Sequence, residues 1–231
     1  MALNLYMHPL SSYCQKVVIA LYESDTPFTP RIVDLGDQDA RAAFVALWPT
    51  AKIPLLEDVE RARIVPETSI IIEYLDRHYP GAQPLLPMSA DARLEARLWD
   101  RLLDLYVMSP MQRIVADRIR PDSERDARGV ADAVATLNMA YDMIERQMAE
   151  RSWAAGAAFS IADCAAAPAL FYASIVVPFA QSHVHLAAYF ERLMQRPSIS
   201  RTIDDARPFF RFFPFKDSIP ARFLANASSA A

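Results

Sequence analysis

The chain has 231 residues, of which 53% are hydrophobic and 23% charged, and its formal net charge is −4 at pH 7. This composition is typical of a folded globular protein, and the length fits one large domain or two small ones. A net acidic chain is disfavoured as a general nucleic-acid binder, because neutralising phosphates requires a basic surface.

Residue counts and spacing exclude several kinds of site. The four glycines, Gly36, Gly81, Gly129 and Gly156, lie too far apart for a G-x-G-x-x-G or Walker A loop. Two cysteines cannot build a Cys-rich zinc module, and four histidines leave little for a His-built site, so we expect no metal. The first residues lack the pattern of a signal peptide, and the most apolar stretch, 162–180, is interrupted by Asp and Pro. We therefore expect a cytoplasmic protein without a membrane partner.

The first 80 residues alternate between strand-like and helix-like apolar spacings. The expected elements, in chain order, are a strand at 3–7, a helix at 14–23, a strand at 31–35, a helix at 37–47, a hairpin of strands at 54–57 and 62–65, and a helix at 66–79. An early βαβ unit followed by a hairpin predicts a mixed sheet with helices on its faces.

Three prolines and a glycine between residues 80 and 87 indicate a linker, after which only helical spacing persists. The expected helices lie at 89–120, 123–151, 160–171, 184–196 and 198–205. Pro110 could kink the first of them, and the tail at 225–231 is expected to be frayed. We predict an α/β domain at residues 1–82, a linker at 83–89 and an all-helical domain at 90–231.

Small polar side chains follow the first strand in His-Pro-Leu-Ser-Ser-Tyr-Cys-Gln-Lys-Val, residues 8–17. Free N–H groups and the positive end of the helix dipole at such a helix start can hold an anion or a thiolate. An ordinary N-cap serine would also explain the segment.

A second segment, Lys52-Ile53-Pro54, opens a strand. A cis proline there would leave the backbone of Ile53 exposed, so that an extended peptide could pair with it. The alternative is a trans proline at the first position of the strand.

A third segment, Pro66-Glu67-Thr68, begins a helix and is another possible anion-binding terminus, with simple capping as the alternative. Ser160 and Asp163 differ from these segments, because they are expected to form a capping box that starts a buried helix and carries no chemistry.

Together, and in this order, the segments resemble the glutathione S-transferase family over nearly the whole chain. The P-x-S-S-x-C-x-K-V start resembles the serine-type and cysteine-type classes. Residues 52–54 resemble the family's K/Q-V-P segment with its cis-proline, and residues 67–75 resemble its E-S-x-x-I-x-x-Y-L pattern. Residues 159–163 and 196–198 resemble its capping box and its late R-P-S segment. The resemblance, which is to serine-type, bacterial-like cytosolic members, implies a thioredoxin-like N-terminal domain, an all-α C-terminal domain and a homodimer.

The resemblance implies a catalytic role for Ser11, which lies five positions before Lys16, where serine-type members keep their hydroxyl. Of the glutaredoxin C-P-Y-C motif only the second cysteine, Cys14, remains, which argues against disulfide exchange. Tyr13 replaces the cysteine of the zeta-like S-S-C motif, which argues against maleylacetoacetate isomerase. Tyr6 is the alternative thiolate donor, since some classes use a tyrosine near the end of the first strand.

A glutathione site is implied at Lys52, Ile53, Pro54, Glu67 and Thr68. The tripeptide would pair along the edge at Ile53, and its glycyl carboxylate would meet Lys52. The γ-glutamyl carboxylate would meet Thr68 and the helix terminus that follows Glu67.

Three residues, Tyr106, Met108 and Met111, are our candidates for the acceptor-substrate side, since soft and adaptable side chains suit varied apolar substrates. The aromatic run at 209–215 could cap the acceptor pocket or pack across the helical domain. Cys164 is expected in the core, and the His-x-His pair at 183–185 has no evident third ligand.

The implied function is that of a glutathione transferase, which activates the glutathione thiol as a thiolate for attack on a small electrophile. Glutathione is then a co-substrate, no metal is needed, and no nucleic acid is bound. Alternatives are a glutathione-dependent isomerase, dehalogenase or peroxidase, and a non-catalytic glutathione-binding member. In the implied homodimer, the helix at 89–120 would form the interface.

Overall fold

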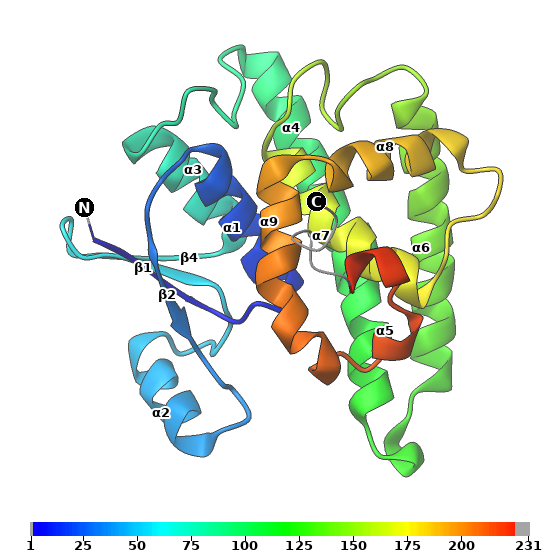
Figure 1. The fold of residues 1–231 in the computed structure, drawn as a ribbon, viewed down its shortest axis with the longest axis horizontal. Helices are drawn as coiled ribbons and strands as arrows, with labels where there is room; N and C mark the ends of the chain where they lie inside the picture. Colours follow the sequence, from blue (N-terminus) through cyan, green and yellow to red (C-terminus); the bar gives the residue numbers. More distant parts are fainter. Residues whose placement is uncertain (1, 225–231) are drawn as a thin grey trace.

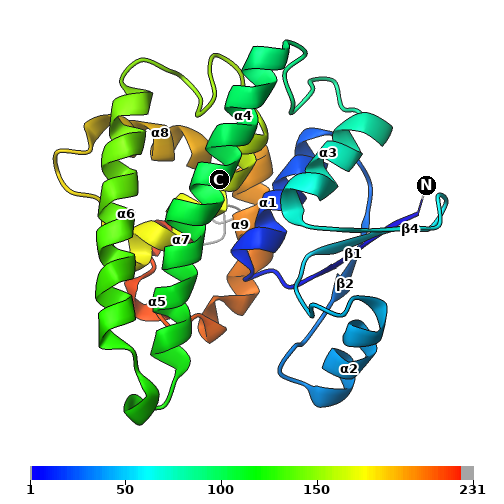
Figure 2. The same ribbon diagram turned by 180° about the vertical axis from the view of Figure 1, so that it is seen from behind.

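The computed structural model describes residues 2–224, so the predicted frayed tail at 225–231 lies outside the described residues. A small α/β unit is followed by a bundle of helices, and the two lie side by side in both views (Figures 1 and 2). The predicted fold class, a thioredoxin-like N-terminal domain with an all-helical C-terminal domain, is confirmed.

A four-stranded mixed sheet in the order β2-β1-β3-β4 forms the centre of the first unit. Its strands are β1 (Leu3–Met7), β2 (Thr29–Ile32), β3 (Leu55–Asp58) and β4 (Arg63–Pro66). β2 is parallel to β1, whereas β3 is antiparallel to both β1 and β4. The second strand was predicted at 31–35, but pairing of β1 with the segment from Thr29 to Ile32 places it earlier.

Helices cover both faces of this sheet (Figure 1). They are α1 (Ser12–Glu23) and α3 (Thr68–His78) on one face and α2 (Gln38–Leu47) on the other. The alternation of β1 explains the two layers, because Leu3, Leu5 and Met7 are buried in the larger core with α1. On the opposite face, Phe44 of α2 packs in a smaller cluster with Leu55.

The helical domain begins at residue 90. Its helices are α4 (Ala90–Leu103), α5 (Ser109–Ile119), α6 (Ala127–Met148), α7 (Ile161–Val176), α8 (Val184–Met194) and α9 (Pro197–Ala206). Short 3₁₀ helices lie at Asp122–Glu124, Arg207–Phe212, Lys216–Ser218 and Ala221–Phe223. Between α3 and α4, the linker is held down by Leu85 and Leu86, which are both buried.

A π-helical turn, η1 (Asp104–Met108), joins α4 to α5. The long helix predicted at 89–120 is therefore continuous, but wider at this point. Pro110 cannot donate a backbone hydrogen bond, and the Ser109 N–H reaches back five residues to the carbonyl of Asp104. Because the wide turn changes the helical phase, it alters which side chains face the neighbouring domain.

The predicted capping box at the start of α7 is confirmed. The buried carboxylate of Asp163 accepts from the Ser160 N–H at 2.9 Å, the Ala154 N–H at 2.9 Å and the Tyr189 hydroxyl at 2.6 Å. Burial nevertheless raises the pKa of Asp163. The next residue, Cys164, is fully buried as predicted.

His183 is the N-cap residue of α8, and both of its ring nitrogens are occupied. Nε2 lies 2.9 Å from Asp142 Oδ1, and Nδ1 accepts from the Ala180 N–H at 3.2 Å. Among residues 2–224, no helix is both long and apolar enough to cross a membrane.

Candidate functional site

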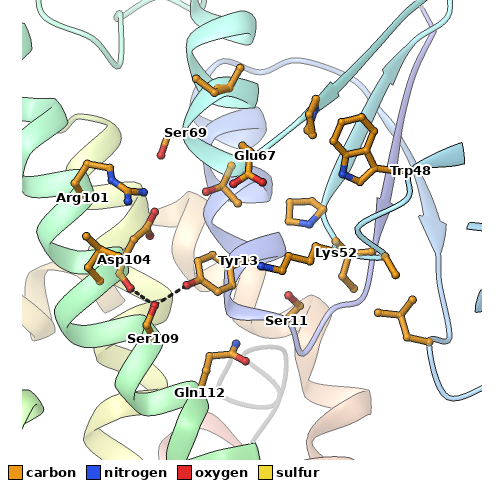
Figure 3. A pocket seen from close by; sticks show the side chains of 18 residues that line it. Ser11, Tyr13, Trp48, Lys52, Glu67, Ser69, Arg101, Asp104, Ser109 and Gln112 are labelled. Carbon is orange, nitrogen blue, oxygen red and sulfur yellow. Dashed lines mark hydrogen bonds between the residues drawn. The ribbon is translucent and has the colours of Figure 1, made fainter. Parts of the chain in front are cut away.

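A cleft of about 620 Å³ lies between the two domains (Figure 3). One wall comes from the α/β domain: the turn after β1, the segment before β3 and the start of α3. The other wall comes from α4, η1 and α5. All six residues predicted to act in catalysis or glutathione binding line this cleft: Ser11, Lys52, Ile53, Pro54, Glu67 and Thr68.

Ser11 caps the N-terminus of α1. Its Oγ accepts from the Cys14 N–H at 3.3 Å, which leaves the hydroxyl hydrogen available for an acceptor in the cleft. The N–H groups of Ser12 and Tyr13 belong to the first turn and have no intrahelical acceptor. The capping role and the proposed thiolate-binding role are therefore compatible in one side chain.

Cys14, one turn further on, is fully buried and does not line the cleft. Burial raises the pKa of its thiol to about 12. A thiol that is both inaccessible and protonated is a poor nucleophile.

Tyr6, the alternative thiolate donor, does not line the cleft. Its hydroxyl donates to Glu57 Oε2 at 3.2 Å, and its ring lies 5.9 Å from that of Phe44 in α2. The residue therefore belongs to the sheet face that α2 covers. Burial and the neighbouring carboxylate of Glu57 both raise the pKa of Tyr6.

The Ile53–Pro54 peptide bond is cis, as the resemblance implies. Pro54 is buried, and the backbone of Ile53 makes no hydrogen bond with another described residue. The N–H and C=O of Ile53 are thus available to an extended peptide. Lys52 is exposed, and its ammonium points into the cleft (Figure 3).

Glu67 precedes α3 with a φ of 67°, an uncommon backbone conformation for a glutamate. Its side chain does not cap the helix. The first N–H groups of α3 therefore remain without a backbone or side-chain acceptor among the described residues, and they face the cleft beside Thr68. A carboxylate would find several donors there.

Sequence reasoning missed a buried charge cluster beneath the cleft. Lys16 is fully buried, and its Nζ lies 2.7 Å from Asp100 and 2.8 Å from Asp104. Ser69 donates to Asp100 at 2.5 Å and accepts from Lys16 at 3.1 Å. Burial raises the pKa of Asp104, the charge of Lys16 lowers it, and the charge of Asp100 raises it. The available signal was a lysine within an apolar helix, together with aspartates one turn apart on a later helix.

The helical wall of the cleft is more polar than expected. It consists of Arg101, Asp104, Leu105, Ser109 and Gln112. Tyr13 and Ser109 share a hydroxyl–hydroxyl hydrogen bond of 3.2 Å, and Ser109 Oγ donates to the Asp104 carbonyl at 2.8 Å (Figure 3).

None of the predicted acceptor-side residues, Tyr106, Met108 and Met111, lines this cleft. Met108 is fully buried in the core, and Tyr106 faces a shallow groove against α6. The π turn explains this difference, because it rotates the following residues about the helix axis. The residues that face the cleft are instead 101, 104, 105, 109 and 112.

A second cavity, of about 270 Å³, adjoins the cleft at Ser11 and Gln112, which line both. Met111 lies here, together with Leu10, Val115 and part of the aromatic run.

The aromatic run at residues 209–215 has two roles. Phe210 and Phe213 pack on the rings of Phe171 and Tyr172, whereas Phe212 is 62% exposed and lines the cavity.

Comparisons with known proteins agree with this geometry. Residues 5–83 match the family described as glutathione S-transferase, N-terminal domain, and residues 105–197 match glutathione S-transferase, C-terminal domain. Glutathione S-transferase GstB of Escherichia coli is 25% identical over 84% of this chain and 93% of its own length. A stringent starvation protein A homolog of Haemophilus ducreyi is 25% identical over 89% of this chain and 92% of its own.

A solved glutathione S-transferase from Methylobacterium radiotolerans, in complex with glutathione sulfonate, has a TM-score of 0.76 and 29% identity. The match covers 87% of this chain and 94% of that one. Both domains and their order thus have counterparts in one family. The chain belongs to the glutathione S-transferase family.

Proposed function

We propose that the protein is a glutathione transferase in which Ser11 stabilises the glutathione thiolate. The observation that carries the proposal is the position of the Ser11 hydroxyl. It caps α1 in the same cleft that the free backbone edge of Ile53 and the free N-terminus of α3 line. A related solved structure contains glutathione sulfonate, which supports binding of the tripeptide here.

The magnitudes support this chemistry. An unperturbed thiol has a pKa of about 8.5, so only a few per cent is thiolate at neutral pH. Lowering the pKa by about two units requires about 2.7 kcal/mol of preferential stabilisation of the anion. One charge-assisted hydrogen bond contributes about 1.5–3 kcal/mol, and a helix N-terminus adds about 0.3–1 kcal/mol. Ser11 acts as a hydrogen-bond donor to the thiolate and need not be its base.

The thiolate attacks a small electrophile held on the far side of Ser11. The cavity lined by Leu10, Met111, Val115 and Phe212 supports an apolar acceptor there. Of the three acceptor-side candidates, Met111 is retained in this proposal. Tyr106 and Met108 are not, since neither lines the cleft or this cavity.

Two assays test the proposal. Calorimetry should detect glutathione binding at millimolar ligand, and a panel of halonitroarenes, isothiocyanates, epoxides and hydroperoxides should reveal turnover with at least one class. Absence of binding removes the proposal. Turnover that is confined to hydroperoxides, or that isomerises or dehalogenates the substrate, would favour the related glutathione-dependent activities.

A second candidate is a glutathione-binding protein without turnover. The observation that favours it is the similarity to a stringent starvation protein A homolog, whose name does not describe a transferase. Binding of glutathione with an unshifted thiol pKa and no turnover on the panel would support this candidate.

We also propose that the protein is a homodimer, as family membership implies, with α4 to α5 at the interface. Leu94 and Leu98 are 68% and 49% exposed on α4, which supports an apolar contact there. A location in the cytoplasm remains part of the same proposal.

A further inference from the structure

Among the described residues, three charged side chains line the cleft without an ion pair or a hydrogen bond. Lys52 and Arg101 lie on opposite walls, and Glu67 lies between them at the start of α3. Figure 3 shows the ammonium, the guanidinium and the carboxylate pointing into the space that these walls enclose. Across residues 2–224, no ion pair or side-chain hydrogen bond occupies any of the three.

Arg101 differs in this respect from the other arginines of α4. Arg93 donates to the Pro87 carbonyl at 2.9 Å, and Arg97 makes two hydrogen bonds to Glu73, at 2.8 and 2.6 Å. Arg101 follows at the same four-residue spacing, yet it has no such acceptor within the described part of the chain.

The nearby carboxylate of Asp104 does not fill this role. It pairs with Lys16, whose Nζ lies 2.8 Å away and also pairs with Asp100. Burial raises the pKa of Asp104 and the charge of Arg101 helps to lower it, but among the described residues no ion pair or hydrogen bond joins the two side chains. A guanidinium that faces a cleft, unpaired, is suited to a bidentate contact with a carboxylate.

The three free charges match those of glutathione. At neutral pH the tripeptide carries two carboxylates and one ammonium. Apart from Asp104, which pairs with Lys16, the lining of the cleft offers two cations and one carboxylate. The ammonium and one carboxylate of glutathione belong to the same γ-glutamyl carbon, whereas the other carboxylate is at the glycyl end. Glu67 and Arg101 together can bind the charged groups of the γ-glutamyl end, and Lys52 can bind the glycyl carboxylate.

We propose that Arg101 binds the α-carboxylate of the γ-glutamyl residue, opposite Thr68 and the free N–H groups of α3. The assignment rests on the proposed function and deepens it. Residues of both domains would then form the glutathione site, because Arg101 belongs to the helical domain and the remaining ligand-binding residues belong to the α/β domain. Glu67 then binds the α-ammonium and selects ligands that carry one.

The test uses calorimetric titration of the wild-type protein and two variants, Arg101→Gln and Arg113→Gln. Arg113 is the matched control, because it is exposed on α5 and does not line the cleft. Two peptides are compared: glutathione, and 4-aminobutyryl-Cys-Gly, which lacks only the α-carboxylate. We expect Arg101→Gln to weaken glutathione binding about five- to tenfold and to leave binding of the second peptide unchanged. Arg101→Lys should restore part of the loss, and Arg113→Gln should change neither affinity.

Two outcomes would overturn the assignment while leaving the proposed function intact. In one, Arg101→Gln weakens the binding of both peptides equally, which would indicate a general effect of charge or structure. In the other, Arg101→Gln leaves the binding of both peptides unchanged. If the wild-type protein binds no glutathione at all, the proposed function fails and the assignment fails with it.

Discussion

Lys16 Nζ of the α/β domain lies 2.7 Å from the carboxylate of Asp100 in the helical domain, and both side chains are almost completely buried. With Asp104 and Ser69, this pair joins α1, α3 and α4 directly beneath the cleft. A buried cation with two carboxylates contributes little net stability when intact, yet removing one partner leaves uncompensated buried charge. The cluster therefore fixes the position of the α3 start relative to the helical wall.

Lys16→Met tests this role. We expect the variant to lose about 3–5 kcal/mol of unfolding free energy at pH 7, because two buried carboxylates would remain without their cation. Burial already raises the pKa of Asp104, and removing the charge of Lys16 would raise it further, so the variant should regain stability as the pH falls towards 5. Urea titrations at the two pH values measure both effects.

The control for this experiment is Arg128→Met, which removes an exposed pair with Asp132 at 3.0 Å. It should change stability by less than about 1 kcal/mol. A Lys16→Met protein as stable as this control at pH 7 would show that the cluster is not strongly coupled to folding.

The contribution of Asp58 to stability should depend on pH in the opposite direction. Its buried carboxylate accepts from the hydroxyls of Tyr74 at 2.7 Å and Tyr79 at 2.5 Å and from the Arg61 N–H at 3.1 Å. Burial tends to raise the pKa of Asp58, but the two tyrosines and Arg61 outweigh it, so the pKa is lowered overall.

A carboxyl with a lowered folded-state pKa stabilises the protein above its unfolded pKa, about 3.9, and loses that contribution as the pH falls through the folded value. We therefore expect Asp58→Asn to be less stable than wild type at pH 7. The difference should shrink below about pH 4. Thermal unfolding across this range measures the difference, and a gap that widens in acid would contradict the assignment of Asp58 as the titrating group.

The proposed dimer is tested by Leu98→Glu. Because Leu98 is exposed on α4, one turn from the exposed Leu94, a charge there should abolish an apolar interface. Sedimentation should show wild type at twice the chain mass of 26.0 kDa and the variant at 26.0 kDa. Met139→Glu, on the exposed face of α6, should remain dimeric. A wild-type protein that sediments only as the single chain at micromolar concentration would exclude the dimer.

The features that could be predicted from sequence are local ones. β1 occurs at the predicted residues, and Ser160 with Asp163 caps α7, because alternation and capping depend on neighbours in the chain. The cleft residues of the α/β domain followed from motifs at the ends of strands and helices. The phase of the helical wall could not be predicted, since it depends on a π turn whose width no spacing rule gives.

Contacts between residues far apart in the chain could not be predicted from the sequence either. The sequence places Lys16 in a motif, but its partners Asp100 and Asp104 lie more than 80 residues away in the chain and meet it only when the domains pack. Arg101 was missed for the same reason. On α4 it is one of three equally spaced arginines, and only the packed structure separates the one that faces the cleft from those with protein partners.

The last prediction separates the possible thiolate-binding groups. Ser11→Ala should raise the pKa of bound glutathione and lower turnover while leaving the affinity for glutathione nearly unchanged, because the hydroxyl favours the thiolate over the thiol. A complete loss of one charge-assisted hydrogen bond, about 1.5–3 kcal/mol, corresponds to a pKa increase of about one to two units. Titration of thiolate absorbance measures the shift, and the rate against pH measures its consequence.

Cys14→Ala is the matched variant, one turn away on the same helix. The thiol of Cys14 is buried and its pKa is raised to about 12, so it should neither ionise nor reach glutathione at neutral pH. We expect a modest loss of stability from the small cavity and little change in turnover. If Cys14→Ala abolishes activity and Ser11→Ala does not, mixed-disulfide chemistry replaces the serine mechanism. If only Tyr6→Phe is inactive, the thiolate donor is the strand tyrosine, which would require its hydroxyl to leave Glu57 and reach a cleft that it does not line.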